Sequence, residues 1–198
     1  MVSFIPSYDG TKVLAGLAAI RIGAYSATAP LQLPAKTVPL GGGWPAGWIA
    51  VGATQEGVTE NFQRSTSAIR VEEQATPVAT ETDSIDFNYE MILSQDTLDT
   101  WKLAAGGGTI TVVPPASGVP GYRLLQLSTD LDKLCLGLEG KNPYGMPTRV
   151  RVPLISSVGN IAKKYRRAAD ARRYAVKFNV LSAVEDVEIQ EIFAAALP

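Results

Sequence analysis

The chain of 198 residues contains no histidine and a single cysteine. Without histidine it cannot form the Ser–His or Cys–His pairs of nucleophilic enzymes, a histidine general base or a histidine-ligated zinc site. Cys135 cannot form a disulfide within the chain, and its place between Leu134 and Leu136 predicts a small buried side chain. These shortages exclude several classes of active site before any motif is considered.

Long apolar segments are lacking as well. No run approaches the roughly 20 apolar residues that a membrane helix needs. The run VLAGLAAI at 13–20 resembles the apolar part of a signal peptide, but Asp9 stands upstream and Arg21 interrupts it. We therefore expect synthesis in the cytoplasm and no association with a membrane.

Motifs that carry chemistry in other proteins are present only in fragments. The glycine-rich stretch 41–47 lacks the Gly-Lys-Ser/Thr ending of a nucleotide-binding loop and predicts a hinge. Asp130 and Asp132 lack the glycine and the closing glutamate of a calcium loop and predict a turn. Glu72 and Glu73 are adjacent, so they point to opposite sides of an extended segment. The sequence predicts no enzyme, no cofactor and no metal site.

Periodicity and composition favour antiparallel β structure. In SIDFNYEM at 84–91, apolar residues alternate with polar ones from Ile85 to Met91, which predicts a strand with one buried face. The tryptophans are predicted to be packing anchors: Trp44, Trp48 and Trp101. Further strands are expected at 47–54, 59–65, 109–113, 122–129, 132–139, 148–155 and 173–180.

Two helices are expected beside these strands. The first, at about 94–105, is predicted to be capped by Ser94 or Asp96 and to end at the glycines from Gly106. The tail at 184–197 is acidic first and apolar later, which favours a C-terminal helix.

Prolines and a triple glycine set residues 1–46 apart from the rest of the chain. Proline at this density prevents a long helix or a central strand, so we predict an extended N-terminal arm that packs on its own domain or on a neighbouring subunit. Residues 47–198 are predicted to form one domain, an antiparallel β-sandwich or partly closed barrel with the helix at 94–105 on its flank. The polar stretch at 66–83 is predicted to be a long loop.

Charge is divided between two blocks. Residues 55–100 hold ten acidic and two basic residues, whereas residues 141–177 hold ten basic residues and one acidic residue. This division has three interpretations. The blocks neutralise each other within one subunit, they face each other between identical subunits, or the basic block binds phosphate. A sequence pI of about 5.5 argues against a nucleic-acid-binding domain.

Residues 47–107 resemble the major tail tube proteins of long-tailed, non-contractile bacteriophages. The likeness lies in the order of features: a strand ending Gly52-x-Thr54, a turn at Glu56–Gly57, a polar loop with "VEEQ…PV", the alternating strand, and then "L…DTLDTW…A". The segment 165–186 looks like the closing strand pair of that family.

The resemblance implies the fold that tail tubes share with the type VI secretion tube, a β-sandwich flanked by a helix. It also implies a structural protein of the virion tail, assembled in the host cytoplasm. Six copies would form a ring, and rings would stack head to tail with other tail proteins into the conduit for DNA ejection. Genomic DNA would pass through the lumen without specific binding.

Three other functions are open at this point. A tail terminator or tube-initiating ring would share the fold, and a nucleic-acid-binding module would use residues 163–177. A carbohydrate- or receptor-binding sandwich at a tail tip would need an exposed aromatic platform.

Two groups of residues are candidate contacts between subunits. The resemblance maps the loop that contacts the adjacent ring onto Arg70, Glu72, Glu73, Glu81 and Asp83. The basic block supplies the second group: Lys163, Lys164, Arg166, Arg167, Arg172 and Arg173.

Charge reversal tests the second group. When Arg166, Arg167, Arg172 and Arg173 are all changed to glutamate, we expect polymerisation to be impaired more than folding, because the block would then repel an acidic neighbour. Sedimentation measures the polymer, and thermal unfolding measures the fold. An unaltered yield of polymer would show that the block does not face another subunit.

Overall fold

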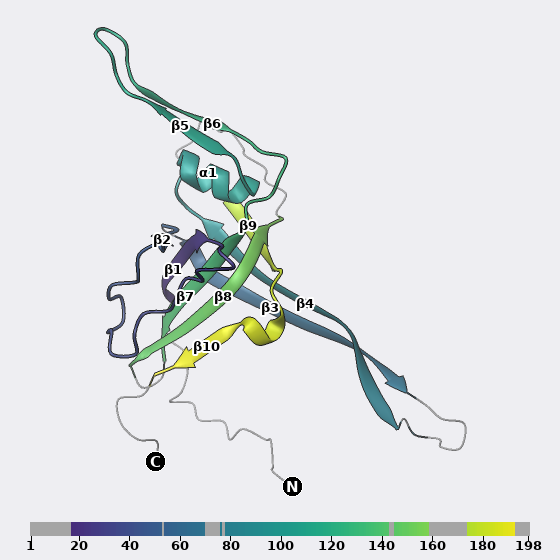
Figure 1. Cartoon of the computed structure of the whole chain (residues 1–198). Coiled ribbons are helices and arrows are strands. Elements are labelled where there is room, and N and C mark those ends of the chain that lie inside the picture. The colour runs from purple at the N-terminus through teal and green to yellow at the C-terminus, as the bar shows by residue number, and fades with distance from the viewer. Residues whose placement is uncertain are drawn as a thin grey trace. The chain divides into compact units, whose positions relative to one another are not determined.

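The computed structural model describes residues 17–52, 54–69, 76, 78–142, 145–158 and 174–192. These residues form antiparallel strands and one short α-helix, so the predicted mainly β class is confirmed (Figure 1). The described strands form no closed barrel. Contacts divide the chain into two compact units: Met1–Gly52 with Lys133–Leu154 and Ser182–Pro198, and Ala53–Asp132 with Ile155–Leu181.

The first unit is an antiparallel sheet that includes part of the predicted arm. β1 (Leu17–Ala24) pairs with β2 (Ile49–Ala50) on one side and with β7 (Leu134–Lys141) on the other. β7 neighbours β8 (Pro147–Ser157), whose first part also pairs with β10 (Glu188–Glu191). The predicted division of the chain at residue 46 stays a prediction, but residues 17–24 are paired strand.

A fully buried ion pair holds the segment between β1 and β2. Arg149 and Glu139 have no solvent-exposed side-chain surface, and Arg149 Nε donates to Glu139 Oε1 at 2.8 Å. The guanidinium also donates to the backbone oxygens of Ala35 at 3.1 Å and Val38 at 2.7 Å. Glu139 Oε2 accepts from the N–H of Gly41 at 3.0 Å. One ion pair thus replaces the backbone partners that this proline-rich segment cannot find in a sheet.

Two tryptophans fix the same segment on β7, as the sequence predicts. Trp48 is buried and donates its Nε1–H to the oxygen of Gln32 at 2.9 Å. Trp44 packs edge-on against Trp48, with ring centroids 5.2 Å apart. A Cβ at Gly137 would lie 2.5 Å from the Trp44 ring, so the rings need glycine at this point of β7.

The second unit holds a sheet and a separate two-stranded hairpin. β4 (Ala79–Leu93) pairs with β3 (Thr54–Ile69) on one side and with β9 (Tyr174–Val180) on the other, and β9 pairs with the end of β8. Its core joins buried residues of the paired strands β4 and β9: Tyr89, Met91, Leu93, Tyr174, Val176 and Phe178. β5 (Thr109–Val113) pairs with β6 (Tyr122–Gln126) in the hairpin.

The helix α1 (Leu98–Ala105) lies within the predicted range but begins at a different cap. Thr97 is the N-cap, and its Oγ1 accepts from the N–H of Thr100 at 3.1 Å, so the prediction of Ser94 or Asp96 was wrong. Gly106 ends the helix at a φ of 84°, which favours glycine. A Cβ there would also approach Leu131 to 2.8 Å.

Two other predicted elements differ in the structure. No α-helix forms in the described part of 184–197: a short 3₁₀ helix (Val184–Asp186) leads into β10, which pairs with β8. Arg151 Nε lies 3.0 Å from Glu188 Oε2 and holds Glu188 there. Local sequence patterns do not predict this partner, because it is 37 residues away. The loop predicted at 66–83 is shorter, because residues 66–69 and 79–83 belong to the β3–β4 ladder. Their polar composition reflects exposure of both faces.

Removal of one partner tests the buried ion pair. Glu139→Gln leaves the Arg149 charge uncompensated away from water, so we expect the free energy of unfolding to fall by about 3–5 kcal/mol. Asp99→Asn, which breaks the exposed pair of Asp99 and Arg123, is the matched control, with an expected loss of about 0–1 kcal/mol. Denaturant titration of both variants gives the comparison, and equal losses would contradict the anchoring role.

Candidate functional site

The β3–β4 hairpin carries the two predicted contact residues that the structure describes. Glu81 and Asp83 are exposed on β4, and Asp83 Oδ1 accepts from Ser67 Oγ at 2.8 Å. Arg70, Glu72 and Glu73 lie outside the described residues. So does the whole predicted basic group: Lys163, Lys164, Arg166, Arg167, Arg172 and Arg173.

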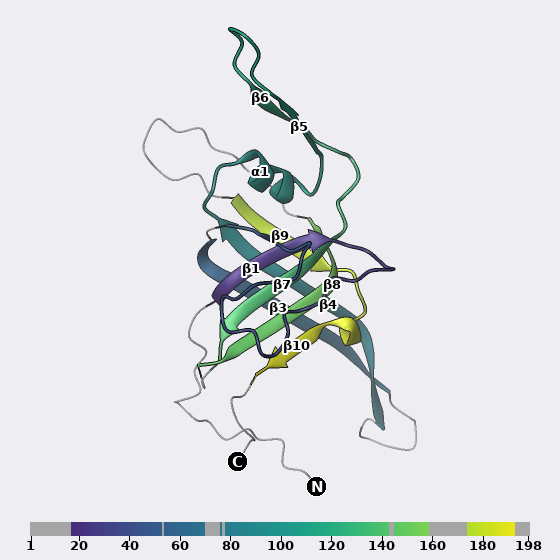
Figure 2. The same ribbon diagram turned by 60° about the vertical axis from the view of Figure 1, so that its left-hand side comes forward.

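This hairpin extends beyond the strands that support it. β9 pairs with β4 from Asn88 to Leu93, whereas residues 79–87 of β4 pair only with β3 among the described strands. Figures 1 and 2 show the outer ends of β3 and β4 projecting from the second unit as a two-stranded ribbon. A two-stranded ribbon is marginally stable in water by itself, so this part of the chain lacks the support that a third strand or a covering layer gives.

One face of the ribbon continues the core face of the sheet. Phe87 and Tyr89 are buried, but Ile85, next on the same face, is 37% exposed. Phe62, paired with Phe87, is 45% exposed and packs edge-on against it with ring centroids 5.4 Å apart. We call this surface the ribbon apolar face, and it contains the following residues: Phe62, Arg64, Ile85, Thr66, Thr82, Ala68 and Thr80.

The ribbon apolar face carries no acidic residue, although the ribbon itself is acidic. Arg64, paired with Ile85, places its guanidinium over the Phe62 ring at 5.7 Å from the centroid. Glu81 pairs with Ser67 on the opposite face. The acidic residues of the ribbon thus lie away from this face, which carries one positive charge, Arg64, and is bordered by Glu60 opposite Tyr89.

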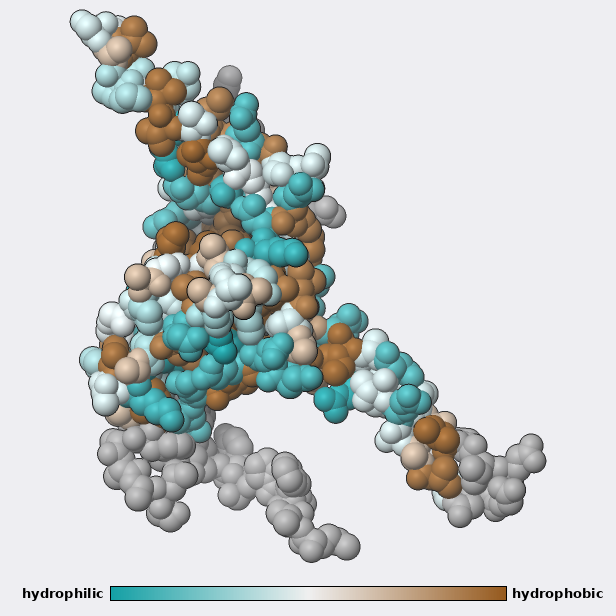
Figure 3. Space-filling model, viewed as in Figure 1, coloured by the Kyte–Doolittle hydropathy of each residue, from teal (hydrophilic) through white to brown (hydrophobic). Residues whose placement is uncertain are grey.

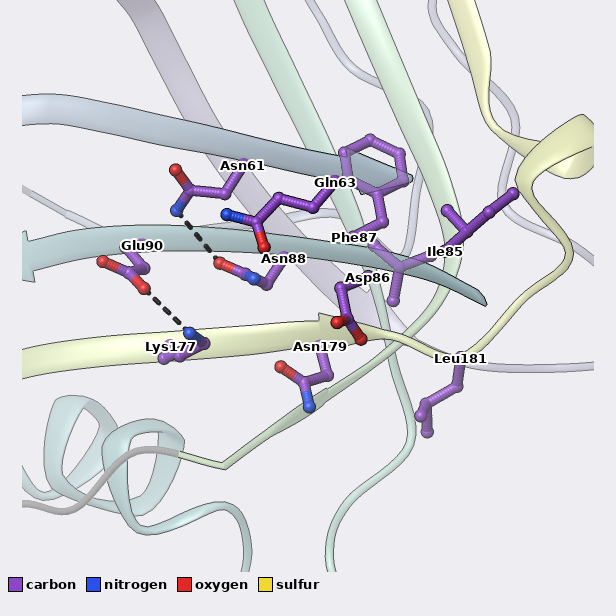
Figure 4. A pocket seen from close by; sticks show the side chains of 11 residues that line it. Asn61, Gln63, Ile85, Asp86, Phe87, Asn88, Glu90, Lys177, Asn179 and Leu181 are labelled. Carbon is purple, nitrogen blue, oxygen red and sulfur yellow. Dashed lines mark hydrogen bonds and ion pairs between the residues drawn. The ribbon is translucent and has the colours of Figure 1, made fainter. Parts of the chain in front are cut away.

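The opposite face of the sheet is a polar hollow of about 660 Å³ (Figure 4). Strand register aligns Asn61, Asn88 and Asn179 in one row across β3, β4 and β9. Asn61 Nδ2 donates to Asn88 Oδ1 at 3.0 Å, and Lys177 pairs with Glu90 at 3.0 Å. The alternation at 84–91 predicted this polar face of β4, but only the strand pairing in the structure shows which residues of β3 and β9 lie beside it.

The described basic residues of the 141–177 block are largely paired within the chain. Arg149 pairs with Glu139 and Arg151 with Glu188, and both acids lie outside the 55–100 acidic block. Lys177 pairs with Glu90, which belongs to that block. Pairing within the subunit therefore accounts for three of the four described basic residues of the block, and two of the three acids lie outside residues 55–100.

Metal ligands and the single thiol can be assessed among the described residues. They contain no group of three or more His, Cys, Asp or Glu residues placed to hold a metal ion. Burial raises the pKa of the Cys135 thiol, which nearby Arg151 partly counteracts, and Sγ donates to the oxygen of Pro153 at 2.9 Å. The thiol is therefore protonated near neutral pH and a weak nucleophile. Among the described residues, none of the helices has the length and apolarity to span a bilayer.

Comparison of the chain with models of known protein families finds no match, and comparison with curated proteins finds no matching sequence.

Tyr89, on the core side of the ribbon, predicts a loss of stability in alkali. Burial raises its pKa above the ordinary 10.0, and the Glu60 carboxylate on β3 adds to the rise. The fold therefore favours the protonated phenol, and this contribution is complete below pH 10 and lost as the pH rises further. We expect denaturant titrations to show that the wild type loses more stability above about pH 10 than Tyr89→Phe. A pH-independent difference between the two proteins would contradict this.

Proposed function

We propose that this chain is a structural subunit of a phage tail tube, which polymerises as stacked hexameric rings. The observation that carries the proposal is the ribbon apolar face, an extension of the subunit's own core face into solvent. Its large apolar side chains, Phe62 and Ile85, are exposed where the core face ends, and exposed apolar side chains that adjoin a core favour a protein–protein interaction site. The resemblance adds the form of the assembly, since the ribbon occupies the place in the chain of the loop that contacts the adjacent ring in tail tube proteins.

The polar hollow supports a conduit for DNA. Its row of asparagines is uncharged, and its lysine, Lys177, is paired with Glu90. Because attraction to nucleic acid comes mainly from free lysine and arginine that displace counterions, such a surface holds phosphate weakly. This is the property that a channel wall for rapid passage of DNA requires.

Electron microscopy of the purified protein tests the proposal, and we expect stacked rings with six-fold symmetry. Ile85→Asp places a charge on the ribbon apolar face, so the concentration needed for assembly should rise at least about tenfold. Ser84→Asp adds the same charge at the neighbouring exposed residue on the opposite face and is the matched control.

Three outcomes separate the alternatives. A monodisperse monomer at every concentration would reject a self-assembling subunit. Single rings that never stack would indicate a terminator or initiator ring instead of a tube. Equal effects of Ile85→Asp and Ser84→Asp would remove the ribbon apolar face from the interface.

A further inference from the structure

The β5–β6 hairpin is a second exposed element, and it is almost free of charge. Residues 107–129, which we call the finger, contain one charged residue, Arg123. Arg123 Nη2 lies 2.9 Å from both carboxylate oxygens of Asp99 on α1, so this charge is already paired. The finger thus offers no unpaired charge to a partner.

The finger exposes large apolar side chains on its outer surface. Register places Tyr122 and Leu124 on one face with Thr111, and they are 57% and 46% exposed. The opposite face holds Ile110 and Leu125, which are half-buried. Figure 3 shows hydrophobic surface gathered along this projection. Other exposed apolar residues of the finger are Val112, Val119 and Leu127.

The edge of β5 is unprotected. Its five residues, TITVV, include no charge and no proline, and its register with β6 runs without a bulge. No other strand among the described residues pairs with β5. Soluble proteins usually protect an edge strand with lysine, proline or a bulge, because a bare apolar edge associates with other chains. A bare edge beside exposed apolar side chains is therefore expected to be covered in the working state.

Charge argues for a protein partner. Nucleic acid needs unpaired lysine or arginine, and the finger has none. Anionic membrane surfaces attract polybasic segments, whereas the nearest helix contributes Lys102, which pairs with Asp132 at 3.3 Å. An uncharged surface with aromatic and aliphatic anchors matches the core of a protein–protein interface.

The same unit supplies a matching surface at its other end. Figures 1 and 2 show the finger and the β3–β4 ribbon projecting from opposite ends of the second unit. The ribbon apolar face carries no acidic residue, and its one charged side chain, Arg64, lies over the Phe62 ring at 5.7 Å from the centroid. Two different surfaces at opposite ends of one unit make a heterologous contact, which repeats from copy to copy in one direction.

We propose that the finger of one copy docks on the ribbon apolar face of the next copy. This inference rests on the proposed function, since it names the contact through which that assembly propagates. Tyr122 and Leu124 of the finger cover Phe62 and Ile85 of the neighbour, and each of these exposed faces gains a covering layer.

Substitution in the finger gives the first test. Leu124→Asp puts a charge on the outer face, and we expect the full-length protein to need at least about tenfold higher concentration to assemble, by sedimentation. Ser117→Asp, in the exposed tip, is the matched control and should assemble as the wild type does. Unchanged thermal unfolding of both variants shows that the fold is intact.

Cross-linking identifies the neighbour. Leu124→Cys and Ile85→Cys proteins are mixed and treated with a short bismaleimide, and we expect products that join one variant to the other. The wild type controls for Cys135, which is buried. Products formed only between two Leu124→Cys chains would overturn the inference in favour of a finger-to-finger contact.

The remaining outcomes separate this inference from the proposed function. If Leu124→Asp assembles like the wild type, the finger lies outside the contact and the inference fails, while the tube assignment stands. If the wild type never assembles, both fail together.

Discussion

The first unit depends on one charge pair that water does not reach. Arg149 and Glu139 lie on the neighbouring strands β8 and β7, and both are fully buried. Such a pair is costly to desolvate, and it is stable only where further hydrogen bonds satisfy both groups. The backbone of residues 34–41 supplies those bonds. The buried pair therefore satisfies backbone groups of the proline-rich segment, and those hydrogen bonds in turn compensate the desolvation of the pair.

The second unit shows the opposite condition, apolar surface without cover. β4 is buried where β9 flanks it, and it becomes exposed on both faces where only β3 remains beside it. The finger repeats this arrangement with a second pair of strands. Because such hairpins are marginally stable in isolation, the proposed assembly would supply part of their stability. This makes the two hairpins the parts of the chain on which the proposed self-association depends.

Charged residues are distributed very unevenly among the described residues. Buried charge organises a segment at Arg149, whereas at the polar hollow Lys177 is paired with Glu90 and Asp86 leaves the lining net negative. Charge is almost absent from the finger and is confined to one side of the ribbon, apart from Arg64. A chain whose net charge is −1 thus contains local environments that differ sharply, and net charge alone describes none of them.

The sequence by itself determined several of the strands and which of their faces is buried. Alternation at 84–91 placed Phe87, Tyr89 and Met91 on the buried side, and turn residues separated β5, β6, β7 and β8 near their observed limits. These features are local, because side-chain period and turn chemistry act within a few residues.

Only the tertiary structure decided which charges pair and where the ladders end. Glu139 and Arg149 are ten residues apart, but Arg149 also donates to backbone oxygens more than a hundred residues earlier in the chain. The stretch at 66–83 looked like a loop because exposed strands are polar on both faces, and the tail beyond 184 looked helical because its partner on β8 is distant in sequence. Long-range pairing overrides local preference wherever a free strand edge is available, and no local pattern records that edge.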